Sequence, residues 1–228
     1  MAIKYTYVGH GTHLLDIGGK KVLIDPFFTS NPSTEVSADS VEVDFILVSH
    51  GHFDHVEDLI AIAQRTGAKV ISNAEIVGWV QGQGIENAHP QHLGGGFTHD
   101  FGHLKLTIAH HGSGLPDGSY GGNPAGLLIT SDDNKKLYFA CDTALFADMQ
   151  LYGAEGIDLY VVPIGDNFTM GPDDALKSIE YVKPKVAVPC HYNTWPLVEQ
   201  DADAWAKRVE AESSTKVNVL APGESIYI

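Results

Sequence analysis

The feature that most constrains this chain is a short apolar run that leads directly into a group of histidines. Val43–Val48 reads VDFILV, and its apolar and β-branched residues are typical of a buried strand. The next residues read SHGHFDH, which places His50, His52, Asp54 and His55 close together. Burying three imidazoles and a carboxylate without partners is costly, so a fold that buries this strand must also supply partners at its end.

Other segments with strand character end in the same residue types. LKLTIA (Leu104–Ala109) leads into His110 and His111, KLYFA leads into Asp142, and KVAV leads into His191. Rigid strands aim the residues at their ends into one crevice, so we expect these side chains to meet at one sheet edge. Spacing alone does not choose between His110 and His111.

Imidazole and carboxylate groups are ligands that divalent transition metals prefer. Residues two apart in extended chain face the same side, so His50 and His52 are predicted to bind one ion. Asp54 and His55 lie one tight turn further on and are predicted to reach a second ion. Asp142 has two carboxylate oxygens and can bridge the two. The pattern therefore predicts a dinuclear site with room for a shared water.

The rest of the chain alternates strand-like and helix-like segments, with no Pro/Gly/Ser-rich linker, so one domain over residues 1–228 is expected. Further strands are expected at Ile3–Val8, His13–Ile17, Lys21–Ile24, Lys69–Ser72, Ala125–Ser131, Lys136–Ala140, Asp158–Pro163, Lys185–Val188, Lys216–Leu220 and Ser225–Ile228. Helices are expected from His55 to a C-cap at Gly67, and at Ala74–Gln81, Ala144–Tyr152, Pro172–Val182 and Glu199–Glu210. Sheets combined with helices in both halves predict a layered α/β sandwich.

Composition restricts the partners and the location. The formal net charge is −15, which repels phosphate backbones, so a nucleic-acid partner is disfavoured and a small-molecule substrate is expected. The sequence has no signal-peptide layout and no run near the ~18 apolar residues of a membrane span, which predicts a soluble cytoplasmic protein. The oligomeric state stays open, and a homo-oligomer is possible.

The remaining cysteines and histidines are interpreted as structural. Cys141 and Cys190 each precede a candidate ligand, and strand geometry predicts that they point into the layer behind as small buried hydrophobes. Five histidines show no strand-end pattern and are expected to have surface or local structural roles: His13, His89, His92, His99 and His103.

The sequence HGHFDH at residues 50–55 matches the H-x-H-x-D-H motif of the metallo-β-lactamase fold superfamily. The later His, Asp and His follow in the order of that superfamily. YVGHGTHLLDIGGKKVLIDPF, CDTALFADM and VPCHYNTWP are similar to the UPF0173 metal-dependent hydrolases. That group resembles the ascorbate-phosphate lactonase and N-acyl-phosphatidylethanolamine-hydrolysing phospholipase D branches. The resemblance covers essentially the whole chain and implies a four-layer αββα sandwich, with two similar halves and the site at the sheet edge.

The resemblance also selects the third histidine, because that residue usually follows a small residue and one variable position. His111 then joins His50 and His52 at one ion, while Asp54, His55 and His191 hold the other, with Asp142 between them.

Four residues are candidates for a supporting or substrate-binding role. Asp25, in LIDP, matches a family carboxylate that can accept the spare ring N–H of a metal-bound histidine; the alternative is an Asp-Pro turn. His10, Asp166 and Asn193 could contact substrate or the ligands. The alternatives are a structural histidine at His10 and a turn or helix cap at Asp166.

The implied chemistry is hydrolysis. Two divalent cations lower the pKa of a bridging water from 15.7 towards about 7, and the resulting hydroxide attacks a small ester, lactone or phosphodiester. Asp54 would serve as a ligand and as the catalytic proton acceptor. Zn²⁺ suits these ligands, and Mn²⁺, Fe²⁺ and Ni²⁺ tolerate the same set.

Other functions fit this sequence less well than a hydrolase. A ribonuclease of the same fold generally has a clamp domain and basic surfaces, and this chain has neither. A diiron redox protein generally has Glu where His52 stands. A secreted β-lactamase is disfavoured by the missing signal peptide and by His55, and a glyoxalase-II-like thioesterase by the missing C-terminal helical domain. A metal-binding module without catalysis also remains an alternative.

Overall fold

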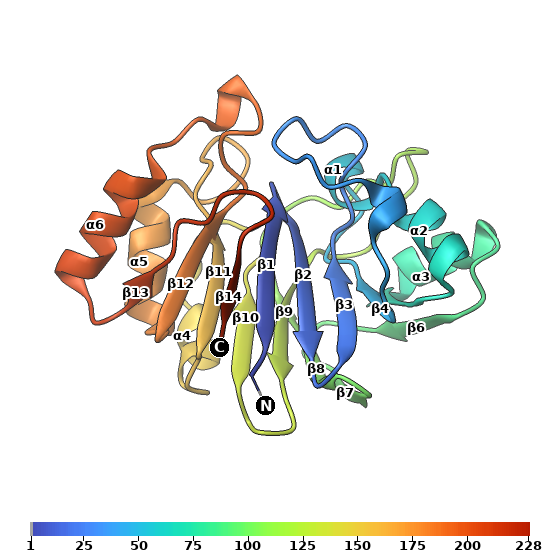
Figure 1. The fold of residues 1–228 in the computed structure, drawn as a ribbon, viewed down its shortest axis with the longest axis horizontal. Coiled ribbons are helices and arrows are strands. Elements are labelled where there is room, and N and C mark those ends of the chain that lie inside the picture. The colour runs from blue at the N-terminus through green and yellow to red at the C-terminus, as the bar shows by residue number, and fades with distance from the viewer. Residues whose placement is uncertain (1) are drawn as a thin grey trace.

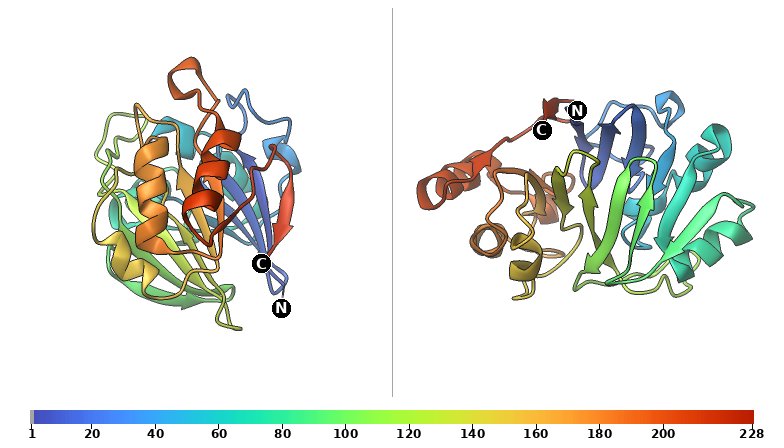
Figure 2. Two further views of the ribbon diagram at one scale, coloured as in Figure 1. Left: turned by 90° about the vertical axis from the view of Figure 1, so that its left-hand side faces the viewer. Right: turned by 90° about the horizontal axis from the view of Figure 1, so that it is seen from below.

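The computed structural model describes residues 2–228. Two seven-stranded sheets face each other, and helices cover the outer face of each (Figures 1 and 2). This is the four-layer αββα sandwich that the resemblance implied. No helix within residues 2–228 is both long enough and apolar enough to cross a bilayer.

The first sheet contains most of the N-terminal half of the chain and the C-terminal strand. In order of pairing, its strands are β14 (Ser225–Tyr227), β1 (Lys4–Gly9), β2 (Thr12–Ile17), β3 (Lys20–Ile24), β4 (Phe45–Leu47), β5 (Lys69–Asn73) and β6 (Ala88–Gln91). The strands of the second sheet are β13 (Lys216–Val217), β12 (Val186–Cys190), β11 (Leu159–Pro163), β10 (Lys136–Phe139), β9 (Ala125–Thr130), β8 (Gly102–Ile108) and β7 (Gly96–His99).

Both sheets are mixed and share one layout. In the first sheet β14, β1, β2 and β3 are antiparallel neighbours, and β3, β4, β5 and β6 run parallel. In the second sheet β7, β8, β9 and β10 are antiparallel, and β10, β11, β12 and β13 run parallel. The molecule therefore has two similar halves. One consequence is that β1, β3 and β4 all end at one edge of their sheet, and β8, β10, β11 and β12 at one edge of theirs.

The helices cover the parallel parts of the sheets. The first sheet carries α2 (Leu59–Thr66) and α3 (Ala74–Gly82), and the second carries α4 (Met149–Gly153), α5 (Pro172–Val182) and α6 (Ala202–Glu212). One turn of helix, α1 (Phe53–Val56), begins at the sheet edge, and 3₁₀ turns form at Ala38–Ser40 and Pro196–Val198.

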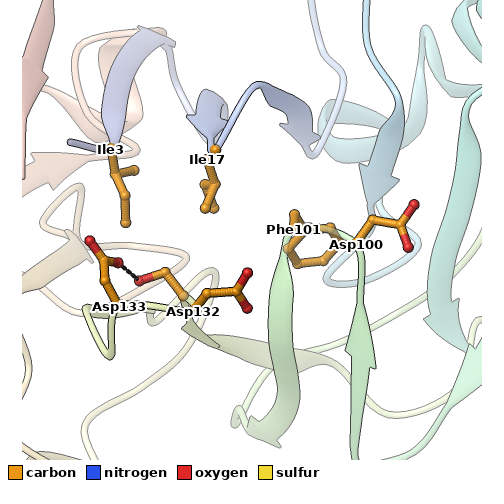
Figure 3. Close-up of a pocket in the computed structure, with 8 residues that line it drawn as sticks. Ile3, Ile17, Asp100, Phe101, Asp132 and Asp133 are labelled. Atoms are coloured by element: carbon orange, nitrogen blue, oxygen red, sulfur yellow. Dashed lines mark hydrogen bonds between the residues drawn. The ribbon is translucent and has the colours of Figure 1, made fainter. Parts of the chain in front are cut away.

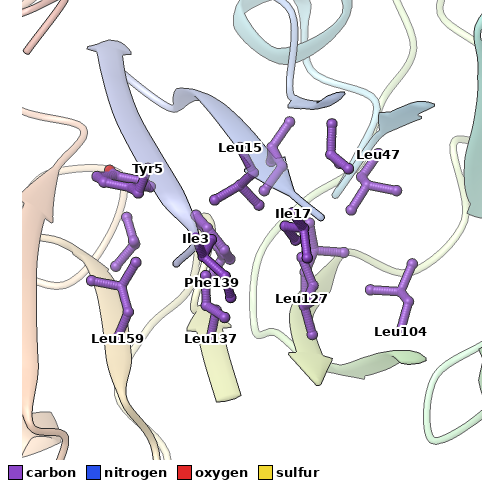
Figure 4. Packing of buried hydrophobic residues seen from close by; sticks show 14 of the residues in the cluster. Ile3, Tyr5, Leu15, Ile17, Leu47, Leu104, Leu127, Leu137, Phe139 and Leu159 are labelled. Atoms are coloured by element: carbon purple, nitrogen blue, oxygen red, sulfur yellow. The ribbon is translucent and has the colours of Figure 1, made fainter. Parts of the chain in front are cut away.

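Three apolar clusters hold the layers together. The central cluster lies between the sheets, where Leu15 and Ile17 of β2 face Leu127 of β9 and Phe139 of β10 (Figure 4). The two outer clusters join helices to sheets: Ile62 of α2 packs with the first sheet, and residues of α5 and α6 pack with the second. Alternation along these strands directs one set of side chains to the centre and the other set to the helices.

Most of the predicted elements are present, and the differences have local causes. The predicted helix after His55 is divided into α1 and α2, because Asp58 N donates to Pro26 O at 3.1 Å instead of to a carbonyl of the helix. The Asp58 carboxylate holds the same loop by accepting from Phe28 N at 2.7 Å and Thr29 N at 3.0 Å. The predicted C-cap at Gly67 is confirmed by its φ of 70°. The predicted helix at Ala144–Tyr152 is shortened to α4, which starts only at Met149.

The sequence analysis did not predict β6 and β7. Both are short edge strands, and one contains Pro90 while the other starts with Gly96, which are residues that weaken a strand pattern. Edge strands need fewer apolar residues because one side has no neighbour, so periodicity gives little signal there.

His13 is a buried histidine in the core between the sheets. Its Nδ1 lies 3.0 Å from the Tyr5 hydroxyl, its ring packs on Phe139, and only 3% of the residue is exposed. Burial lowers the pKa of His13 to about 3. It is therefore neutral in the folded protein at neutral pH, and its role is structural.

We predict that His13 makes the protein less stable in acid. The unfolded chain binds a proton at His13 near pH 6.5, whereas the folded chain does not until about pH 3. Stability from this group is therefore complete above pH 6.5 and falls by up to roughly 1.4 kcal/mol per pH unit below it. In urea unfolding, the free energy of unfolding of His13→Gln should fall less between pH 7 and pH 5 than that of wild type. The exposed His103→Gln should follow wild type; an equal slope in all three proteins would contradict the prediction.

Candidate metal centre

The sheet edges described above bring distant segments of the chain together. His10, Asp25 and the segment His50–His55 follow β1, β3 and β4 in the first sheet, while His111, Asp142 and His191 follow β8, β10 and β12 in the second. The seven side chains predicted as ligands are thereby gathered at the edge between the two sheets. They are called the cluster below: His50, His52, Asp54, His55, His111, Asp142 and His191. Their predicted role as ligands rests on the distances that follow.

The backbone at these strand ends is strained. His10, Asp25, Cys141 and His191 have positive φ angles of 54°, 48°, 53° and 54°, although none is glycine. Left-handed backbone costs a non-glycine residue roughly 1–2 kcal/mol, and such strain gathers at functional sites. His191 is one of the seven predicted ligands, Cys141 directly precedes Asp142, and His10 and Asp25 hydrogen-bond to two other predicted ligands.

One group of nitrogens comes from both sheets. His50 Nε2 lies 3.1 Å from His52 Nδ1, and His111 Nε2 lies 3.2 Å from the same His52 atom. Their candidate ligand atoms all lie within 4.8 Å of one another. The neighbouring His110 is exposed and its ring packs on Phe146. Of the two adjacent histidines, His111 is therefore the one in the cluster.

The second group contains Asp54, His55 and His191. His55 Nε2 and His191 Nε2 each lie 3.7 Å from Asp54 Oδ2. Both histidines are almost completely buried, whereas the Asp54 side chain is 20% exposed. Asp54 is therefore the acidic member of this group that solvent can reach.

Asp142 lies between the two groups. Its Oδ2 atom is 3.9 Å from His50 Nε2 and 3.4 Å from His111 Nε2 on one side. On the other side it is 3.4 Å from His55 Nε2 and 3.1 Å from His191 Nε2. One carboxylate oxygen thus faces four imidazoles, two from each group.

Asp25 supports the cluster from behind. Its carboxylate accepts hydrogen bonds from Ser49 N at 2.7 Å, from Ser49 Oγ at 2.5 Å and from His55 Nδ1 at 2.9 Å. Because a carboxylate only accepts, His55 carries its proton on Nδ1, and Nε2 is left to face Asp142. Asp25 can also be grouped with His50 and His55 as a possible cation site. We interpret it as a support, because its oxygens are already used by these donors.

His10 supports Asp54 in a similar way. His10 Nε2 donates to Asp54 Oδ2 at 2.9 Å, and His10 Nδ1 accepts from the Thr194 hydroxyl at 2.8 Å. Burial, followed by the nearby His191, lowers the pKa of His10 to about 4, so it is neutral. The next residue is Gly11, where a Cβ atom would lie only 2.8 Å from His55 Cε1. Glycine lets this segment approach the cluster.

The histidines of the cluster neutralise its carboxylates only in part. Burial lowers the pKa of His50, His52 and His111, which keeps them neutral and able to bind a cation. Burial also opposes charge on His191, but Asp142 and Asp54 outweigh it and raise its pKa to about 9. An imidazolium here compensates for the buried carboxylates, and a bound divalent cation would supply the same compensation.

The donor set fits divalent cations. His55 Nε2 and His191 Nε2 are buried and have no hydrogen-bond partner within the described chain. Unpaired buried polar atoms are costly, so atoms left unpaired beside two carboxylates indicate a missing positive partner. His50, His52 and His111 form one possible cation site, and Asp54, His55 and His191 form another together with His10. These groups, with Asp142 beside both, offer nitrogen and oxygen ligands of the kinds that zinc and related metals take.

Two predicted supporting residues lie outside the cluster. Asp166 is exposed, and its Oδ1 accepts from Asn167 N at 2.9 Å, which stabilises the turn before α5. Asn193 is also exposed, and its Oδ1 accepts from Gln200 N at 2.8 Å. Neither residue lines the cavity above the cluster. These contacts correspond to the structural alternative, in which such residues shape loops.

The two cysteines differ in burial. Cys190 is 3% exposed, lies in the core between the sheets and has a pKa that burial raises, as expected for a small buried hydrophobe. Cys141 lies beyond the end of β10, is half-buried and packs against the same core. Its positive φ shows that the strand geometry assumed for it was wrong.

A cavity of about 430 Å³ opens above the cluster. The cluster forms its polar floor, and its walls are apolar residues that the sequence analysis did not single out: Phe53, Phe168, Trp195 and Leu197. The only sequence signal was the presence of large apolar residues in short loops after strands. That signal is weak, because single exposed apolar residues are common.

A second, smaller cavity of about 230 Å³ lies at the opposite ends of the strands, where turns meet (Figure 3). It is lined by Ile3, Ile17 and Phe101 and by the turn residues Asp132 and Asp133. Ser131 Oγ donates to Asp133 Oδ1 at 2.6 Å. Residues of the cluster do not line this cavity.

Comparison with known proteins identifies the family. A family model described as "Beta-lactamase superfamily domain" matches residues 20–192. A UPF0173 metal-dependent hydrolase of Pelotomaculum thermopropionicum is 45% identical over 231 residues, which cover 99% of this chain and 100% of the relative. This chain belongs to the UPF0173 metal-dependent hydrolases of the metallo-β-lactamase superfamily.

Two further similar proteins support this placement. A UPF0173 hydrolase of Shouchella clausii is 46% identical over 232 residues, covering 99% of this chain and all of the relative. The structure of Igni18, a metallo hydrolase from the archaeon Ignicoccus hospitalis, superposes with a TM-score of 0.91 at 32% identity. That superposition covers 100% of this chain and 99% of Igni18. As a UPF0173 member, the protein is a metal-dependent hydrolase.

We predict that cation binding stabilises this UPF0173 protein and that His111, but not His110, is needed for it. Loading to 100 times the dissociation constant adds about 2.7 kcal/mol, or roughly 5–10 °C in the unfolding midpoint. Chelation should remove this increment from wild type and from His110→Ala, and readdition of Zn²⁺ or Mn²⁺ should restore it. In His111→Ala the increment should be greatly reduced in differential scanning calorimetry. An increment lost in His110→Ala and kept in His111→Ala would reverse the assignment.

Proposed function

We propose that residues 1–228 form one hydrolase domain with a dinuclear metal centre that cleaves a small ester, lactone or phosphodiester. His50, His52 and His111 would hold one ion, and Asp54, His55 and His191 the other. Asp142 would be shared. The observation that carries this proposal is the position of Asp142 Oδ2, which lies between 3.1 and 3.9 Å from four imidazole nitrogens of both groups.

The ligand types favour zinc, while Mn²⁺, Fe²⁺ and Ni²⁺ suit the same set. When bound, such cations lower the pKa of water towards about 7 and polarise the oxygen of a carbonyl or phosphoryl group. Asp25 supports this chemistry by accepting a hydrogen bond from His55 Nδ1, which fixes the tautomer of His55.

Asp54 is proposed to be the catalytic proton acceptor. Its carboxylate lines the cavity and is partly exposed, so it can reach a water molecule beside the substrate. His10 Nε2 donates to Asp54 Oδ2 and thereby orients the carboxylate, while Thr194 fixes His10 from the other side. His10 is therefore a positioning residue, and the proton moves to and from Asp54.

The ribonuclease alternative finds no support in the cavity. Its lining has aromatic, aliphatic, imidazole and carboxylate groups but no lysine or arginine among the described residues. Nucleic-acid affinity depends largely on such cations. The non-catalytic metal-binding alternative makes a different prediction from the hydrolase, namely cation binding without turnover.

We predict two metal ions per chain in the purified, metal-loaded protein. His50→Ala and Asp142→Ala should lose bound metal and turnover together, because each removes a ligand from the centre. Inductively coupled plasma mass spectrometry, with activity measured on the same samples, provides the check. One ion per chain in a fully active wild type would exclude the dinuclear form.

We predict that Asp54→Ala folds but loses at least about a hundredfold in kcat/KM, because general-base contributions are of this size. The assay is a panel of lactones, p-nitrophenyl esters and bis-p-nitrophenyl phosphate, and circular dichroism reports on folding. Asp39→Ala removes an exposed carboxylate that does not line the cavity and should keep wild-type turnover. Wild-type turnover in Asp54→Ala would remove Asp54 from the mechanism.

A further inference from the structure

The cavity above the cluster has an unusually apolar entrance for a charged site. Phe53 and Phe168 are each 49% exposed and Leu197 is 66% exposed, and all three line the cavity. They come from three separate segments, which follow β4, β11 and β12. Exposed apolar side chains that converge from separate segments on one cavity indicate a surface that binds an apolar group.

Part of this apolar wall is held in place before any ligand binds. Phe27 is completely buried, and its ring centroid lies 5.7 Å from that of Phe53 and 6.0 Å from that of Trp195. Trp195 also packs edge-on against His10 at 4.8 Å. A single buried ring thus supports two walls of the cavity, and the wall formed by Trp195 is tied to the residue that orients Asp54.

The loops around the cluster contain no lysine or arginine. The segments that follow the converging strands are 9–12, 25–37, 49–58, 109–124, 141–149, 164–172 and 191–201. All 14 lysines and arginines of the chain lie outside them, whereas acidic residues occur in all but the first. Beyond the metal centre itself, a negatively charged part of a substrate would find no counter-charge here.

We propose that this site takes an uncharged substrate whose apolar, preferably flat, group lies on Phe53, Phe168 and Trp195. The site selects against substrates that carry an anionic group away from the bond to be cleaved. This inference rests on the proposed hydrolase function and narrows its substrate class. A remote carboxylate would lose its water on the apolar walls, and the net charge of −15 would oppose its approach.

The first test compares two esters that differ only at the far end of the acyl chain, with the metal-loaded protein. p-Nitrophenyl pentanoate ends in a methyl group, and mono-p-nitrophenyl glutarate ends in a carboxylate. We expect kcat/KM to be at least about tenfold higher for the pentanoate, since the carboxylate is desolvated without a partner. Equal values, or a preference for the glutarate, would overturn the inference.

The second test places a cation in the cavity wall. Leu197→Lys should raise kcat/KM for the glutarate ester several-fold and lower it for the pentanoate. Leu151→Lys is the matched control, because Leu151 is also an exposed leucine, at 68%, but does not line this cavity. It makes the same change in net charge, so an equal gain in both variants would assign the effect to long-range attraction and contradict a selective pocket.

A binding experiment separates this inference from the proposed function. The 4-nitroanilides of pentanoic and glutaric acid resist hydrolysis and can be titrated against the tryptophan fluorescence of the metal-loaded protein. Tighter binding of the neutral anilide without turnover of any ester would support the pocket and reject ester hydrolysis. Turnover of esters with equal binding of the two anilides would support hydrolysis and reject the selectivity.

Discussion

The rest of the structure depends on one interaction, in which the buried Asp142 carboxylate faces four imidazoles. A carboxylate removed from water needs positive charge nearby, and the histidines from both sheets supply it only when they are protonated. Although burial opposes charge on His55 and His191, the nearby carboxylates, Asp142 first, raise the pKa of His55 well above its usual range and that of His191 to about 9. Divalent cations would neutralise the buried carboxylates more completely. A cluster that would destabilise a metal-free core therefore suits a metal-dependent hydrolase.

The layered fold provides the setting for this cluster. Each sheet delivers its parallel strands to one edge, so residues far apart in sequence arrive at the same place on rigid supports. This arrangement requires strained backbone at His10, Asp25, Cys141 and His191. Hydrogen bonds from Ser49 to Asp25, and between Thr194, His10 and Asp54, then fix the side chains. The polar floor and the apolar walls of the cavity are therefore parts of one rigid edge.

Sequence reasoning succeeded where a local pattern had a single physical meaning. The alternation of apolar residues placed the central strands, and the H-x-H-x-D-H spacing placed the cluster at the end of β4. It failed at β6 and β7, where edge strands carry little periodicity, and at the divided helix, where Asp58 bonds to a loop nearly thirty residues earlier. His13 carried no sequence sign of burial, because a histidine in an alternating strand faces the core or the solvent according to register.

The sequence by itself determined the family and most residues of the cluster, because these follow from residue types at strand ends and from a specific motif, and the resemblance to that family implied the fold. Tertiary structure decided the rest. It placed His111, and not His110, beside His52, and it placed His10 within hydrogen-bond distance of Asp54. It also placed Asp166 and Asn193 where they hydrogen-bond within loops. It also joined Phe53, Phe168, Trp195 and Leu197 into one cavity. These outcomes depend on distances between segments that are remote in sequence, and no local pattern carries that information.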